Sequence, residues 1–168
     1  MRLVLNPDGD VIRHFSSSGN LIGSVGSRRN FRPDLLESGF LVATQDRVGW
    51  YAQGYSGASA SHYIEISVPG MTLHTYPGLP VSSSGHPGRV EQLALTDEGS
   101  AFLSFDDPNS HHRTTYTFDR EKLKWVPLQV PPIAGTAEPH LRGIDGERLV
   151  FTGGHPATFF NALSLNSK

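Results

Sequence analysis

Residues 113–131 most strongly constrain what this chain can fold into. Their sequence is RTTYTFDREKLKWVPLQVP, in which apolar and polar side chains alternate on both sides of a charged turn. Alternation with a period of two residues is typical of half-buried antiparallel strands joined as a hairpin. The stretch therefore predicts β-structure.

Weaker copies of this hairpin recur along the chain at a spacing of 52 residues. The residues in step are Trp125, Leu73 and Leu21 in the second strand and Tyr116, Ile64 and Ile12 in the first. A repeat of about 40 to about 50 residues in an all-strand sequence is typical of the blades of a propeller. We therefore expect an all-β, β-propeller-like fold, in which Tyr116 and Trp125 are packing residues.

The repeat divides the chain into blade equivalents at residues 1–26, 39–77, 90–131 and 140–165 of one domain, residues 1–168. We expect three, four, four and three strands in them, which amounts to about three and a half four-stranded antiparallel blades. A ring normally needs about four blades or more to close, so a partial or half propeller with unpaired strands at its ends is expected. Three alternatives follow: a protein partner or second copy completes the ring, the chain is a fragment of a larger propeller, or an unusual short closure exists.

Composition agrees with this fold and excludes several classes of function. The 18 Gly, 12 Pro and 18% charged residues suit short strands and tight turns. A net charge of −2 argues against a nucleic-acid partner, and the lack of cysteine excludes disulfides and thiolate metal sites. We find no membrane-spanning run and no signal peptide, so a cytoplasmic location is expected by default. A helical turn is expected only at residues 33–37.

Two propeller families are similar to parts of the sequence. Residues 11–26, VIRHFSSSGNLIGSVG, resemble the third and fourth strands of an NHL-type or six-bladed TolB-like repeat. Residues 148–154, RLVFTGG, together with residues 115–132, resemble kelch-type repeats, which carry a double Gly, then a Tyr, then a Trp. Six-bladed lactonase-like propellers hold a divalent ion in the central channel, so the first resemblance implies a channel site of that kind.

The first strands of the blades are expected to line the central channel, with their starting residues on one rim. The candidate ligand-binding residues there are Glu91, Glu138, His140 and Arg142, together with Asp34 or Glu37. Carboxylates and histidine can ligate Ca²⁺ or a transition metal, or transfer protons. A ligand or divalent-ion site on this rim is therefore a hypothesis.

The densest collection of metal-ligand types lies in DDPNSHH, residues 106–112. Its candidates are Asp106, Asp107, His111 and His112. Adjacent side chains of a strand point to opposite faces, so one ion can use both histidines only if they lie in a loop. The alternative is an exposed polar turn without a metal.

These observations leave three hypotheses for function. The first is a non-enzymatic binding module without a cofactor, which contacts a protein or small ligand through loops 54–61, 78–89 and 106–112. The second is a lactonase-like or hydrolase-like enzyme with a divalent cation such as Ca²⁺ in its channel. The third is a half propeller that functions only when assembled. The sequence carries no G-x-S-x-G motif, and its ligand stays unknown.

Overall fold

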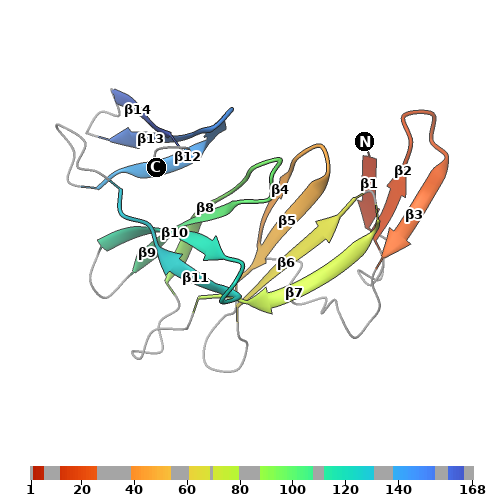
Figure 1. The fold of residues 1–168 in the computed structure, drawn as a ribbon, viewed down its shortest axis with the longest axis horizontal. Helices are drawn as coiled ribbons and strands as arrows, with labels where there is room; N and C mark the ends of the chain where they lie inside the picture. The colour runs from red at the N-terminus through yellow and green to blue at the C-terminus, as the bar shows by residue number, and fades with distance from the viewer. Residues whose placement is uncertain are drawn as a thin grey trace.

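The structure is a computed structural model, and it describes residues 2–5, 12–25, 39–53, 61–68, 70–79, 88–107, 112–130, 138–153 and 159–164. Every regular element in these residues is a β-strand. The strands form four antiparallel sheets of three, four, four and three members, and neighbours in each sheet follow chain order (Figure 1). This confirms the predicted all-β fold and the predicted number of strands in each blade equivalent. The helical turn expected at residues 33–37 lies outside the described residues.

The strand bounds follow the predicted turns. The first sheet comprises β1 (Arg2–Leu5), β2 (Ile12–Phe15) and β3 (Leu21–Val25). The second comprises β4 (Gly39–Ala43), β5 (Arg47–Ala52), β6 (His62–Ser67) and β7 (Thr72–Pro77). The third comprises β8 (Arg89–Leu95), β9 (Ala101–Asp107), β10 (His112–Asp119) and β11 (Lys124–Pro127). The fourth comprises β12 (His140–Asp145), β13 (Arg148–Gly153) and β14 (Phe159–Ser164).

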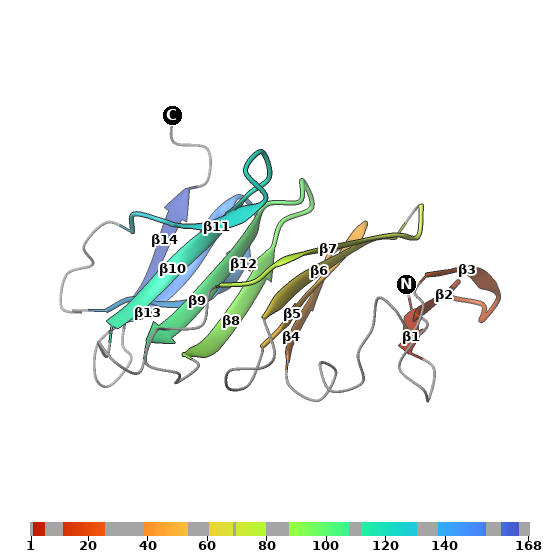
Figure 2. The same cartoon turned by 90° about the horizontal axis from the view of Figure 1, so that it is seen from below.

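The sheets stand one after another in chain order, like consecutive blades (Figure 2). The main contacts between sheets are made by their first strands, since β8 packs against both β4 and β12. The β1–β3 sheet makes no comparably extensive contact with the other three through its described residues. The three later sheets therefore form the best-packed part of the described structure.

The 52-residue repeat is visible in the hydrogen-bond register. Ile66 pairs with Leu73 between β6 and β7, and Phe118 pairs with Trp125 between β10 and β11, so both partners shift by the same number of residues. The first sheet departs from this register, because a shift beside His14 interrupts the pairing of β2 with β3. The two central sheets are thus the closest copies of each other.

A hydrophobic core fills the space between the β4–β7 and β8–β11 sheets. Trp125 lies at its centre, with its ring 5.2 Å from that of Tyr63 and 5.3 Å from that of Phe118. Tyr116 is partly buried against the same core. Both residues are therefore packing residues, as the repeat predicts.

The described residues contain no helix long and apolar enough to cross a membrane.

A second core joins the β8–β11 and β12–β14 sheets. Its buried members are Ala94, Phe102, Leu141, Leu149 and Phe151. A third cluster covers the other face of the β4–β7 sheet and includes Trp50, Ile64 and Ile66. Both faces of the β4–β7 and β8–β11 sheets are thus apolar, which is what stacked blades require.

Candidate binding site

A group of charged residues gathers where β8, β10 and β12 begin. Glu91 comes from β8, Arg113 from β10 and His140 from β12, so two neighbouring sheets contribute. Glu91 is the extra residue of a β-bulge, because Val90 pairs with Phe105 and Gln92 pairs with Ser104. A bulge redirects the side chain of its extra residue. The local backbone irregularity therefore places Glu91 within reach of Arg113 and His140.

Arg113 and Glu91 form a two-pronged ion pair within the third sheet. Arg113 Nε donates to Glu91 Oε2 at 2.5 Å, and Arg113 Nη2 donates to Glu91 Oε1 at 3.0 Å. The Arg113 side chain is only 11% exposed. Bidentate pairs of guanidinium and carboxylate are among the stronger charged hydrogen bonds. Glu91 and Arg113 thus form a rigid ion pair whose opposite charges largely cancel, and the other residues of the group lie around this pair.

His140 connects this pair to the next sheet. Arg113 Nη1 lies 2.8 Å from His140 Nε2, and since arginine can only donate, Nε2 is the acceptor and carries no proton. His140 Nδ1 lies 3.6 Å from Glu91 Oε2. Burial and then the charge of Arg113 lower the pKa of His140 below its ordinary value, although Glu91 opposes this. His140 is therefore a neutral ring at pH 7.

Glu138 and His112 extend the group toward solvent. His112 Nδ1 lies 3.1 Å from Glu138 Oε1, and Glu138 Oε2 lies 3.9 Å from Arg113 Nη1. The His112 side chain is exposed, while Glu138 is half-buried. We call Glu91, Arg113, Glu138, His140 and His112 the rim cluster. It offers carboxylate acceptors and imidazole groups within a few ångströms of one another.

The structure thus brings together three of the four predicted ligand-binding residues, namely Glu91, Glu138 and His140. The fourth, Arg142, donates from Nε to Thr152 Oγ1 at 2.8 Å, and its charge is a further cause that lowers the pKa of His140. Sequence reasoning missed Arg113, which organises the cluster. Its signal was its place in the polar alternation with Thr115 and Thr117 on β10. Asp34 and Glu37 lie outside the described residues.

The predicted metal ligands around residues 106–112 are only partly described. Asp106 and Asp107 end β9, and His112 begins β10 opposite Asp107. Because Asp106 and Asp107 are adjacent on a strand, their side chains leave opposite faces. His111 lies outside the described residues. Among the residues that the structure describes, no three His, Asp or Glu side chains gather in a way that could hold a metal ion.

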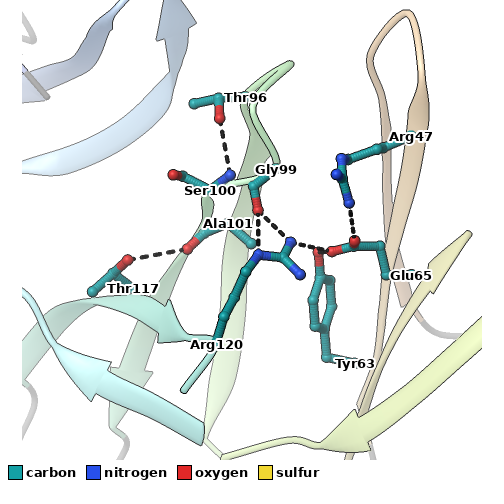
Figure 3. A network of polar contacts seen from close by, with 9 residues as sticks. All are labelled: Arg47, Tyr63, Glu65, Thr96, Gly99, Ser100, Ala101, Thr117 and Arg120. Carbon is teal, nitrogen blue, oxygen red and sulfur yellow. Dashed lines mark hydrogen bonds and ion pairs between the residues drawn. The ribbon is translucent and has the colours of Figure 1, made fainter. Parts of the chain in front are cut away.

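A second polar network lies at the end of the second and third sheets that is opposite the rim cluster. It includes the turn between β8 and β9 and the turn after β10 (Figure 3). Glu65 on β6 is 3% exposed and accepts from Arg47 at 2.7 Å, from Arg120 at 2.6 Å and from the Tyr63 hydroxyl at 3.0 Å. Arg120 also donates from Nε to the Gly99 carbonyl at 3.0 Å. Arg120 and Gly99 belong to turns of the third sheet, so this network joins the second and third sheets.

The arginines decide the charge of Glu65. Burial by itself raises the pKa of Glu65, but the hydrogen bond and charge of Arg120, followed by the hydrogen bonds of Tyr63 and Arg47, lower it below its ordinary value. Burial and the neighbouring carboxylate raise the pKa of Tyr63, so its hydroxyl stays protonated and donates. All groups of this network are paired with one another. Its role is to hold the sheets together, and no sequence pattern predicted it.

No protein-family model matches the chain, and no curated protein is significantly similar to it in sequence. The geometry of the rim cluster and the arrangement of the sheets are therefore the observations that bear on function.

Proposed function

We propose that the chain is a β-propeller-type binding module that contacts a protein or small ligand without transforming it. Its contact surface is the end of the sheets where β8, β10 and β12 begin, and the rim cluster supplies the polar contacts. The observation that carries this proposal is the assembly of Glu91, Arg113 and His140 from two different sheets at that end. As part of the same proposal, the chain is a member of an NHL-like, TolB-like or kelch-like propeller family.

The pairing within the cluster favours recognition over catalysis. Arg113 holds both oxygens of Glu91 and also Nε2 of His140. A general base needs a nitrogen or oxygen that is open toward a substrate proton. Glu138 and His112 are more exposed, so they are the groups that reach a ligand first. A polar segment with both donors and acceptors, such as a peptide, fits this mixture of carboxylate and imidazole.

The proposed surface also includes the chain segments that connect these strand ends. The described strands border residues 54–60, 80–87, 108–111 and 131–137 at this same end of the sheets. Binding residues are disproportionately carried by loops that a rigid scaffold positions. The loops predicted as contact surfaces, residues 54–61, 78–89 and 106–112, are thus attached at the end that carries the rim cluster.

Selection of heptapeptides displayed on phage against the immobilised protein tests the proposal. We expect selected peptides to bind the Glu138→Gln, His140→Ala double variant at least tenfold more weakly than the wild type. The matched control is Glu121→Gln, an exposed carboxylate on the β10–β11 turn, which should leave binding unchanged. Equal binding to the wild type and the double variant would overturn the proposed surface.

The same protein preparation tests the enzyme alternative. Elemental analysis after purification measures whether a divalent ion such as Ca²⁺ copurifies, and lactone hydrolysis is followed by pH-stat titration. Stoichiometric metal, together with hydrolysis that Glu91→Gln abolishes, would replace the binding module by a lactonase-like enzyme. No bound metal and no hydrolysis are expected.

A further inference from the structure

The Leu41 side chain of β4 is exposed, whereas the side chains at the equivalent positions of β8 and β12 are buried. Leu41, Leu93 and Leu141 hold the same position in β4, β8 and β12, since each pairs with a buried hydrophobic residue of the following strand. Leu93 and Leu141 are both 2% exposed, whereas Leu41 is 67% exposed. The repeat therefore contains one position of the interface between first strands that the other described strands leave exposed.

The covered positions show what normally packs there. Leu93 belongs to the core in which Phe40 and Val42 of β4 are also packed. Leu141 belongs to the core that contains Ala94 of β8. Each leucine is thus covered by the first strand of the preceding sheet. For Leu41 that strand would come before β4, and the β1–β3 sheet makes no comparable contact with β4 through its described residues.

We propose that the Leu41 face of β4 is the docking surface for an extended strand of a partner polypeptide. This strand packs on Leu41 as β4 packs on Leu93, and so continues the β4–β8 and β8–β12 interfaces by one member. Since Phe40 and Val42 are two residues apart on one face of β4, the partner strand carries two apolar residues at alternate positions.

A second copy of the chain offers a poorer match. The last sheet would have to present apolar residues on the face turned away from Leu141. Thr152 is the chain neighbour of Phe151 on β13 and so points to that other side, and Arg142, the extra residue of a β-bulge in β12, donates a hydrogen bond to it there. A charged strand in that place does not reproduce Phe40 and Val42. The occupant is therefore a separate, apolar strand.

A synthetic peptide with the β4 sequence, SGFLVATQ, is a suitable probe because β4 itself fills the equivalent place before β8. Fluorescence anisotropy of the fluorescein-labelled peptide should rise in a saturable way on titration with the protein. We expect Leu41→Asp to weaken binding at least tenfold. The matched control is Leu123→Asp, which changes another exposed leucine, 50% exposed, on the β10–β11 turn and should bind as the wild type does.

Two results would overturn the proposal. One is no saturable binding, or equal binding by the wild type and Leu41→Asp, with circular dichroism showing both folded. The other is a wild-type dimer in sedimentation velocity that Leu41→Asp dissociates, since a second copy would then be the occupant. A peptide with Ser in place of its Phe and Val should not bind. Glu138→Gln should leave binding unchanged, which separates this surface from the rim cluster.

Discussion

Glu65 accepts a hydrogen bond of 2.6 Å from Arg120, a residue 55 positions further along the chain. The two residues belong to neighbouring sheets, and Arg47 approaches the same carboxylate from the other side. A buried carboxylate between two arginines is stable only while both partners stay in place. This ion pair therefore reports directly on how the second and third sheets are packed.

Glu65→Gln should lower the free energy of unfolding by about 3 kcal/mol, because it leaves two arginines facing a neutral and misfitting amide. Urea denaturation followed by tryptophan fluorescence measures the change. Glu121→Gln, on an exposed turn, should change the free energy of unfolding by less than about 0.5 kcal/mol. Equal stability of the two variants would contradict a structural role for Glu65.

The contribution of Glu65 should depend on pH. Its pKa is lowered in the folded state, so folding favours the ionised carboxylate, and the stabilisation is complete above the ordinary glutamate pKa of about 4.3. It is lost as the pH falls through the lowered folded-state pKa. The difference in unfolding free energy between the wild type and Glu65→Gln should therefore be constant from pH 7 to about pH 5 and shrink at lower pH. A difference that grows on acidification would contradict this account.

Arg113→Met should raise the pKa of His140. Burial is the first cause of the lowered value and would remain, but the charge of Arg113 is the second and would be lost. Histidine ring signals in NMR spectra, recorded across a pH titration, measure the change. In the wild type, the stabilisation that His140 gives as a neutral ring should be present above about pH 6.5 and be lost as the pH falls through its folded-state pKa. An unchanged titration in Arg113→Met would show that the two side chains do not interact.

Trp125→Leu should destabilise the protein although leucine occupies the equivalent position in the preceding sheet. Trp125 contacts three aromatic rings, those of Tyr51, Tyr63 and Phe118, and leucine would leave a cavity among them. We expect a loss of about 2 to 3 kcal/mol, measured by urea denaturation with circular dichroism. The variant for comparison is Leu73→Ala, which shortens a smaller and only partly buried side chain. It should lower the free energy of unfolding by less than Trp125→Leu does. A larger loss for Leu73→Ala would contradict the assigned core.

Sequence alone predicts the strands because alternation and turn residues are local signals. The alternating patterns around Leu73 and Trp125 are such signals, and their repetition after 52 residues agrees with the hydrogen-bond register. The contacts of Glu91 and His140 follow less directly, since grouping them requires the first strands to lie side by side. Arg113 could not be assigned from the sequence, because its partners come from a bulge in β8 and from the next sheet.

The network around Glu65 could not be predicted from the sequence either. Glu65 alternates with Ile64 and Ile66 on β6, a pattern that predicts an outward-facing charge at the surface of a half-buried strand. The structure instead buries Glu65, because its face packs against the third sheet and Arg120 reaches it from a turn. Packing between sheets, which no local pattern encodes, reverses the expected exposure.

A double-mutant cycle of Glu65→Gln and Arg120→Met tests most directly whether the second and third sheets pack as consecutive blades. The cycle compares the unfolding free energies of the wild type, both single variants and the double variant. Packing as described predicts a coupling energy of about 1 kcal/mol or more between these two residues. Strictly additive effects would contradict it, because residues of unpacked sheets do not interact.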